Sequence, residues 1–256
     1  SGADNAVYWD DGGMRIIAAL IAYVLEFLPE HEQNLLSVRT ILLSGKKGLL
    51  GTACEEMSEA GHMKLSSMMM AGVAAIEAEE SKFFISNAVA TTDWLDSHQI
   101  ADTLCESSFS MRDLKRKSTS LFVVLPFNQL DRSKHGRFLR RMVRCGIGAM
   151  QEAMPDGSEM GERCLFILDE FFALGKISEI AISCGAMPSA GLTLWPFLHN
   201  LGHLIELYGQ EGAQTFFGTS DLHQFFGITD AETLQYISDR IGAFNVDDLP
   251  DEPRYQ

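Results

Sequence analysis

Two adjacent acids, Asp169 and Glu170, follow directly after the apolar run LFIL at residues 165–168. Because polar and apolar positions do not alternate in this run, it predicts a strand buried on both faces, as in a parallel sheet covered by helices. Acids at the carboxyl end of such a strand lie where open α/β sheets bind their ligands. One carboxylate there can hold a magnesium ion through water, and its neighbour can orient and deprotonate an attacking water molecule. A core strand that ends in two solvated acids is the alternative, because the pattern is short.

The second half of the chain contains an ordered series of further motifs. They are LFILDEFFALG (165–175), GLTLWPFLHNL (191–201), LYGQEG (207–212), QFFGIT (224–229) and ETLQYISDRIG (232–242). In order and approximate spacing, the series resembles the nucleotide-binding domain of type IV coupling proteins. STSLFVVLP (118–126) is similar to a strand of that family that ends in a proline, and residues 9–28 and 92–114 look like parts of its inserted all-α domain.

This resemblance implies an α/β fold, in which the parallel sheet of a RecA-like P-loop NTPase carries an inserted all-α domain. Family members are hexameric ATPases that recruit relaxase–DNA complexes or protein substrates and use ATP hydrolysis to drive them into a type IV secretion channel. The resemblance makes Asp169–Glu170 a Walker B motif, with Asp169 holding the Mg²⁺ of bound ATP through water and Glu170 in the catalytic role. His199 stands where family members usually carry a glutamine that senses the γ-phosphate, and we expect it to be catalytic too.

The phosphate-binding loop of such an ATPase is missing from the 256 residues, because no GxxxxGK[ST] sequence occurs. The segment SGKKG at residues 44–48 has Thr40 and Lys47 at the required glycine and Ser/Thr positions, so it predicts a turn. In the family this loop lies just before the inserted domain and would precede residue 1. The chain is therefore expected neither to bind nor to hydrolyse ATP by itself. Residues 183–190 lack the arginine often found there, which leaves the arginine finger unassigned.

Charge is unevenly distributed along the chain. The net charge of −15 argues against an indiscriminate nucleic-acid binder, yet ten of the 20 Lys and Arg residues lie between Arg112 and Arg144. Four of them recur at helical spacing and predict a basic stripe: Arg137, Arg140, Arg141 and Arg144. This stripe is a candidate phosphate-contacting face along a DNA channel. A solvated helix face, or ion pairs with an acidic neighbouring subunit, are the alternatives.

The apolar periodicity changes near residue 117. Up to there the chain predicts helices at residues 10–28, 35–43, 62–90 and 92–104, with a further turn at 110–113. Beyond it, strands are expected at 120–125, 164–168, 192–198 and 223–228. Helices are expected at 136–154, from the end of the 192–198 strand to residue 208, and at 229–240. This alternation indicates a parallel α/β sheet. We predict an all-α domain at 1–116, the C-terminal part of a RecA-like domain at 117–245, and a tail or linker at 246–256.

Several observations bear on the cellular compartment. The five cysteines are scattered without metal-site spacing and fit a reducing cytoplasm. No stretch is long and apolar enough to cross a bilayer, and no signal peptide opens the chain. Because coupling proteins usually carry an N-terminal membrane anchor, the resemblance implies a cytoplasmic fragment of a protein at the cytoplasmic face of the bacterial inner membrane.

Two other functions remain open. The chain could be a non-catalytic scaffold or adaptor that keeps the RecA-like fold without the ATPase, which the absent phosphate loop and His199 would fit. It could also belong to a related DNA-pumping translocase, although the helical insertion and the LWPFLHNL match disfavour this. A phosphate loop encoded just upstream would exclude the scaffold.

Overall fold

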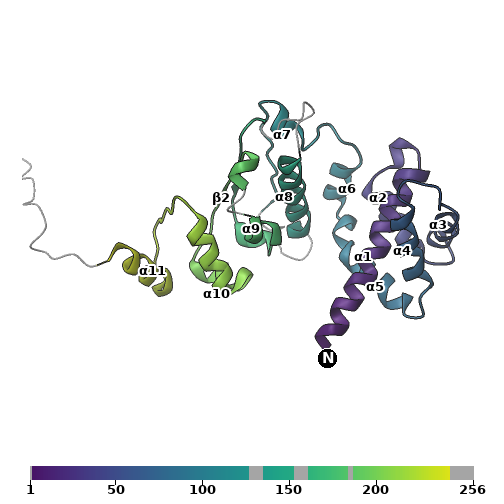
Figure 1. The fold of residues 1–256 in the computed structure, drawn as a ribbon, viewed down its shortest axis with the longest axis horizontal. Helices are drawn as coiled ribbons and strands as arrows, with labels where there is room; N and C mark the ends of the chain where they lie inside the picture. Colours follow the sequence, from purple (N-terminus) through teal and green to yellow (C-terminus); the bar gives the residue numbers. More distant parts are fainter. Residues whose placement is uncertain (1, 127–134, 153–160, 184–186, 243–256) are drawn as a thin grey trace, which may run out of the picture. The chain divides into compact units, whose positions relative to one another are not determined.

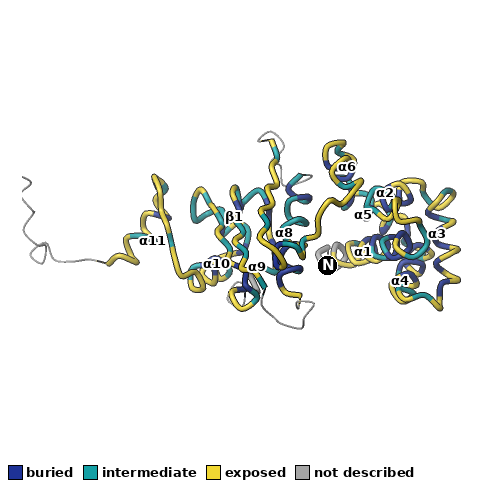
Figure 2. The backbone as a smooth tube through the Cα atoms, turned by 90° about the horizontal axis from the view of Figure 1, so that it is seen from above, coloured by how far each residue is buried: buried dark blue, intermediate teal, exposed yellow. Residues whose placement is uncertain are grey.

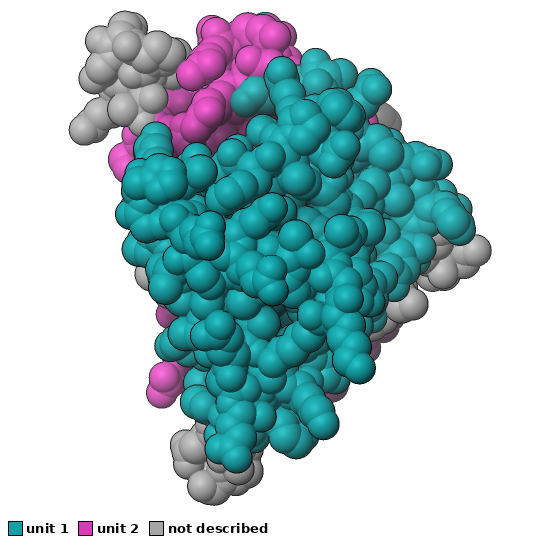
Figure 3. Space-filling model, turned by 90° about the vertical axis from the view of Figure 1, so that its right-hand side faces the viewer, with its two compact units in different colours: residues 1–110, 133–138 teal, residues 111–132, 139–256 magenta. Residues whose placement is uncertain are grey.

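A computed structural model describes residues 2–126, 135–152, 161–183 and 187–242. By contacts the chain divides into two compact units, residues 1–110 with 133–138 and residues 111–132 with 139–256 (Figure 3). Each unit has its own hydrophobic core. The described residues are mostly helical, with one small parallel sheet, which is compatible with the predicted α/β class.

The described residues of the first unit form helices joined by turns, without a strand, and are organised around the longest helix (Figure 1). Its elements are α1 (Gly2–Phe27), η1 (Glu30–Glu32), α2 (Leu35–Ser44), α3 (Leu49–Ser58), α4 (Ser66–Glu77), α5 (Ser81–Thr91), η2 (Asp93–Asp96) and α6 (His98–Leu104). Helix α1 buries Ile16, Leu20 and Val24 at helical spacing and packs mainly on α4 and α5. At Gly72 of α4 a Cβ atom would lie 2.1 Å from that of Ala19, so the glycine lets the two helices approach closely.

Some helix limits differ from those expected. Helix α1 begins at Gly2 rather than near Asp10, and α3 was not predicted at all. The long helix expected over residues 62–90 is divided into α4 and α5, because Ala78 leaves the helical conformation (φ −55°, ψ 153°). The turn expected at residues 44–48 is confirmed, with Gly45 at a positive φ of 69°.

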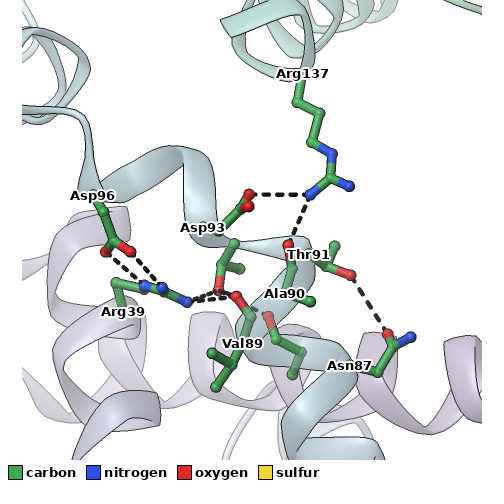
Figure 4. A network of polar contacts seen from close by, with 10 residues as sticks. Arg39, Asn87, Val89, Ala90, Thr91, Asp93, Asp96 and Arg137 are labelled. Carbon is green, nitrogen blue, oxygen red and sulfur yellow. Dashed lines mark hydrogen bonds and ion pairs between the residues drawn. The ribbon is translucent and has the colours of Figure 1, made fainter. Parts of the chain in front are cut away.

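A buried arginine joins α2 to the segment between α5 and α6 (Figure 4). Nε and Nη2 of Arg39 donate to the two carboxylate oxygens of Asp96 at 3.0 and 2.7 Å. Its Nη1 donates to the carbonyl of Val89 and the hydroxyl of Thr92, at 2.6 and 2.8 Å. Because every nitrogen of the guanidinium has a partner, the charge can be buried without a large desolvation cost.

The second unit contains the two strands. Its elements are α7 (Asp113–Arg116), α8 (His135–Gln151, from Leu139 on), β1 (Cys164–Leu168), η4 (Phe171–Leu174), α9 (Ser178–Ser183), η5 (Met187–Ala190), β2 (Leu192–Pro196), α10 (Leu201–Thr219) and α11 (Ala231–Ile241). Strands β1 and β2 pair in parallel, with Cys164 opposite Leu192 and Leu168 opposite Pro196. The predicted strands at 164–168 and 192–198 are thus confirmed.

The two faces of this sheet differ. On one face, Leu168 and Leu192 are buried, and Gly146 of α8 lies against the ring of Phe166, where a Cβ atom would come within 2.7 Å. On the other face Ile167 is 59% exposed, and Leu165 and Trp195 are also exposed. The tube at β1 in Figure 2 is accordingly not buried along its whole length. The prediction that β1 is buried on both faces is therefore wrong for this structure, because among the described residues helices cover only one face.

Two expected strands are not strands. Residues 120–125 and 223–228 have no strand assignment, and Phe122 is 85% exposed. Apolar, β-branched sequence favours an extended chain, but a strand also needs a neighbour for its backbone hydrogen bonds. Among the described residues only β1 and β2 supply such a pair.

The end of the described chain also differs in detail from the prediction. Helix α11 begins at Ala231, two residues later than predicted, and is capped by Asp230, whose carboxylate accepts the N–H of Thr233 at 2.9 Å. The domain limits proposed from sequence stay predictions, and the predicted tail at 246–256 lies outside the described residues. No helix in the described ranges combines the length and apolarity needed to cross a membrane.

Candidate functional site at the ends of β1 and β2

Backbone hydrogen bonds join the residues on either side of the two acids to Phe197, which directly follows β2. The N–H of Phe197 donates to the carbonyl of Leu168 at 3.0 Å, and the N–H of Phe171 donates to the carbonyl of Phe197 at 3.1 Å. Residues 169 and 170 lie between these two bonds and form a short turn at the carboxyl end of β1. Because the partner strand continues from Phe197 into His199, the histidine arrives at the same end of the sheet.

Glu170 has an unusual backbone conformation. Its φ and ψ are 50° and 47°, and it is the one non-glycine with positive φ among the residues that the structure describes. Its Oε2 lies 3.0 Å from Nε2 of His199, while its N–H donates to Oδ1 of Asp169 at 3.1 Å. The Glu170 and His199 side chains are 36% and 65% exposed. The structure thus brings together the three residues predicted to act on a nucleotide, at an edge that solvent can reach.

A second histidine belongs to this cluster. The ring of His203 stacks on Phe172 with centroids 3.9 Å apart and meets the His199 ring edge-on at 5.6 Å. Its Nδ1 is buried and has no hydrogen-bond partner. His203 is not among the candidate site residues identified from the sequence, and the ring contacts with Phe172 and His199 that place it in the cluster are visible only in the fold.

Helix caps fix the chain beside His199. The side chain of Asn200 accepts the N–H of His203 at 3.0 Å and begins α10. The next residue, Leu201, donates its N–H to the hydroxyl of Thr233 in α11 at 3.0 Å. The same helix start lowers the pKa of Asp230, chiefly because the carboxylate accepts the backbone N–H of Thr233. These contacts tie the start of α10 to the start of α11.

The residue that follows the two acids, Phe171, is held by aromatic packing. Phe171, fully buried, lies parallel to the ring of Tyr208 with centroids 6.2 Å apart, and 6.0 Å from Phe216. The Tyr208 hydroxyl accepts the N–H of Ile177 at 3.1 Å. A buried ring directly after Glu170 therefore anchors the turn to α10 and to the segment before α9.

The arginines of the predicted stripe contact different groups of this chain. Arg137 donates to the carbonyl of Ala90 at 2.7 Å and to Asp93 at 3.1 Å (Figure 4). Arg140 donates to the carbonyl of Leu174 at 2.5 Å, and Arg144 pairs with Glu179. Arg141 is half-buried. Their use as a nucleic-acid face stays a prediction, although groups of this chain engage Arg137, Arg140 and Arg144.

The described residues offer only part of a metal site. They contain no group of three or more His, Cys, Asp or Glu side chains placed to hold a metal ion. Magnesium beside nucleotide phosphates needs fewer protein ligands, often one carboxylate acting through water. The carboxylate of Asp169 suits that role, because it is exposed to solvent and its Oδ1 accepts the N–H of Glu170, which fixes its position.

Comparisons with known proteins give the family. The model of the family "Type IV secretory system Conjugative DNA transfer" matches residues 4–248. The chain is 26% identical over 251 residues to the type IV secretion system-coupling protein VirD4 of Bartonella quintana, covering 95% of this chain and 37% of the relative. It is 29% identical over 243 residues to the conjugal transfer protein TraG of Rhizobium radiobacter, covering 91% and 36%.

The protein VirD4 of Agrobacterium fabrum is 29% identical over 151 residues, or 59% of this chain and 22% of the relative. No solved structure matches the chain. The chain thus spans little more than a third of the length of the first two relatives. With a family match that extends over nearly all of its residues, the chain belongs to the type IV secretory system conjugative DNA transfer family, that of the type IV coupling proteins.

Proposed function

We propose that the chain forms part of a type IV coupling ATPase and that Asp169 and Glu170 act on the phosphates of bound ATP. The observation that carries this proposal is the left-handed backbone of Glu170, which directs its carboxylate to His199. A non-glycine residue in this region costs about 1–3 kcal/mol, and strain of this kind gathers at active sites. The surrounding backbone and aromatic contacts explain how the chain holds it.

Each acid has a distinct role in the proposed reaction. Glu170 is the base that orients and deprotonates the water molecule attacking the γ-phosphate. Magnesium, when bound, would neutralise charge on the phosphate oxygens, and Asp169 would hold it through water. His199 keeps the Glu170 carboxylate oriented through Nε2 until a nucleotide is present. The His203–Phe172 stack restricts the position of the His199 ring.

Other parts of the site would come from elsewhere. The 256 residues contain no GxxxxGK[ST] sequence, so a phosphate cradle would be supplied by another segment of a longer protein. A neighbouring subunit of a hexamer would supply the cation that stabilises the developing charge. In this arrangement the assembly, at the cytoplasmic face of the inner membrane, passes substrate into the secretion channel.

The helical unit is proposed to dock the substrate. Residues 1–110 hold 16 Asp and Glu against 6 Lys and Arg, a net charge of −10. Two exposed rings of this acidic unit contact the half-buried ring of Trp9, which lies 5.1 Å from Tyr8 and 4.9 Å from Phe83, centroid to centroid. Aromatic residues are enriched at protein interfaces, and complementary charge favours a basic partner. The relaxase of a relaxase–DNA complex, or a protein substrate, fits this surface better than DNA does.

The ATPase proposal is tested by turnover in the full-length protein that carries this segment. We expect magnesium-dependent ATP hydrolysis, which Glu170→Gln lowers by about 10²-fold or more while ATP binding persists. Glu179→Gln is the matched control, because Glu179 lies in the same unit and pairs with Arg144. A folded hexamer that binds no ATP, or turns it over equally well as Glu170→Gln, would leave the non-catalytic scaffold as the function.

Docking has its own test. We expect Phe83→Ser to weaken binding of the cognate relaxase to the chain, measured by the fluorescence of Trp9, about tenfold or more. Met68→Ser is the control, since Met68 is also exposed on the helical unit but belongs to no aromatic cluster. Equal binding by the two variants would move the docking surface elsewhere.

A further inference from the structure

We propose that Arg140 is a positioning residue for the turn that carries Asp169 and Glu170, and not a contact to nucleic acid. The proposal deepens the function above, since it rests on Glu170 being the base of that reaction. Arg140 and the turn both lie in the second unit. Sequence periodicity groups Arg140 with a stripe of arginines, whereas in the structure its guanidinium contacts the backbone at Leu174 and Gly175.

The contact between Arg140 and the turn is specific. Nε of Arg140 donates to the carbonyl of Leu174, the last residue of η4, at 2.5 Å. The next residue, Gly175, has φ 69° and ψ −168°, which side chains rarely permit. A Cβ atom at Gly175 would lie 2.5 Å from Nη2 of Arg140 and 3.2 Å from its Cζ. The guanidinium therefore occupies the space that the glycine leaves, so that the two residues form one joint.

A short hydrogen-bonded path leads from this joint to Glu170. The N–H of Gly175 donates to the carbonyl of Phe172 at 3.1 Å, and the N–H of Ala173 donates to the carbonyl of Glu170 at 2.8 Å. The intervening 3₁₀ turn is tight and contains few residues, so a displacement at Leu174 reaches the backbone of Glu170. A strained residue persists only where its surroundings over-determine it. Phe197 holds one end of the turn and Arg140 the other.

Helix α8 gives Arg140 a fixed base. At Gly146 this helix lies against the ring of Phe166 in β1, and Ile147 and Met150 are buried. Gly146 is six residues after Arg140, roughly 9 Å along the helix axis. The guanidinium thus extends from a helix already packed on the strand that leads into the acids. Arg144 of the same helix pairs instead with Glu179 in α9, outside the turn, and both side chains of this pair are partly exposed.

The first test measures the turn itself and needs no ATPase. Backbone amides of residues 171–175 are followed by hydrogen exchange in the 256-residue chain. We expect Arg140→Lys and Arg140→Gln each to speed exchange there about tenfold, because a lysine keeps the charge but lacks the Nε donor at the required position. Arg144→Gln is the matched control on the same helix and should leave these amides unchanged. Unchanged exchange in both Arg140 variants would overturn the proposal.

A double variant tests whether Gly175 and Arg140 act through one contact. Gly175→Ala alone should also speed exchange of the turn amides, because the methyl group meets the guanidinium at a positive φ. In Gly175→Ala combined with Arg140→Gln, the increase should be smaller than the product of the two single effects, since the contact can be lost only once. If the increases in exchange rate of the two single variants simply multiply in the double variant, Gly175 and Arg140 do not act through one contact.

The second test separates positioning from nucleic-acid contact in the full-length protein. Without DNA, we expect Arg140→Lys to lower kcat for ATP about tenfold or more, with KM for ATP nearly unchanged. With single-stranded DNA, the salt dependence of binding by Arg140→Gln, which removes the positive charge, should match that of the wild type. A normal DNA-free kcat together with a salt slope reduced by about one would make Arg140 a phosphate contact instead. If the wild type itself lacks turnover, the proposed ATPase fails, and the exchange results still decide the role of Arg140.

Discussion

The helical unit and the unit that carries Glu170 bury their apolar residues to different extents. In the helical unit, α1 is surrounded by its neighbours and its inward positions are closed to solvent. In the other unit, one face of a parallel sheet is packed and the opposite face exposes Leu165, Ile167 and Trp195. Parallel sheets are almost always covered on both faces. The inward face of α1 in the first unit is therefore fully buried, whereas the exposed sheet face of the second unit is suited to further packing.

The units also differ in how they treat charge and strain. The buried guanidinium of Arg39 in the helical unit has a full set of partners on rigid backbone and on Asp96. The second unit holds Glu170 in a left-handed conformation beside an exposed histidine. Polar contacts in the first unit thus serve stability, while those in the second keep a strained and accessible carboxylate in place. Such a division is expected when stability and reactivity are assigned to different parts of a chain.

The contrast in burial predicts the largest difference between matched variants. We expect Ile16→Ala to lower the free energy of unfolding of the helical unit by about 2–5 kcal/mol, because Ile16 is fully buried. The same change at Ile167, on the exposed sheet face, should cost less than about 1 kcal/mol. Hydrogen exchange in urea reports the two units separately. A large cost at Ile167 would mean that another surface covers this face in solution.

The contrast in charge burial predicts a smaller difference. Arg39→Lys should destabilise the helical unit by about 1–3 kcal/mol, since lysine cannot donate to Asp96, Val89 and Thr92 together. Arg144→Lys in the second unit is the counterpart and should cost at most about 1 kcal/mol, because its pair with Glu179 is exposed. Urea unfolding followed by circular dichroism gives both values. Equal costs would remove the distinction between the two arginines.

Strain at Glu170 predicts a gain in stability. Glu170→Gly should stabilise the second unit by about 1 kcal/mol, because glycine adopts the left-handed conformation without steric cost. Glu170→Gln, which keeps the side-chain shape and the backbone strain, is the control and should change stability little. The measurement is the urea midpoint of the second unit. Destabilisation by glycine would show that the carboxylate contributes more to the fold than its backbone costs.

A pH effect that arises from Tyr23 is expected in the helical unit. Burial, and a 2.5 Å hydrogen bond to Glu56, raise the pKa of Tyr23 to about 12. An unfolded tyrosine loses its proton near a pKa of about 10, so the folded state binds more protons between these values. Stability should therefore be intact below pH 10, fall as pH rises, and lose this contribution above about pH 12. Tyr23→Phe should flatten the slope, and an equal slope in both proteins would rule Tyr23 out as the cause.

Several elements could be predicted from sequence for physical reasons that act locally. Helical spacing of Ile17, Ile21 and Val24 marks the apolar face of α1, and an unbroken apolar run marks β1. The run LTLWP predicts β2, and its parallel pairing with β1 follows from the intervening helix. Residues 120–125 are as apolar as β1 but form no strand, because an apolar sequence does not by itself supply a partner for backbone hydrogen bonds.

At the site, residue types and their order predict that two acids end one strand and that His199 follows the next. They suffice for this because the carboxyl ends of parallel strands meet at one edge of a sheet. The left-handed backbone of Glu170 beside His199, the stacking of His203 on Phe172 and the bond from Arg140 to Leu174 become visible only in the folded chain. These contacts join residues up to 34 positions apart. They depend on the packing of α8, α10 and the sheet, which no local pattern in the sequence specifies.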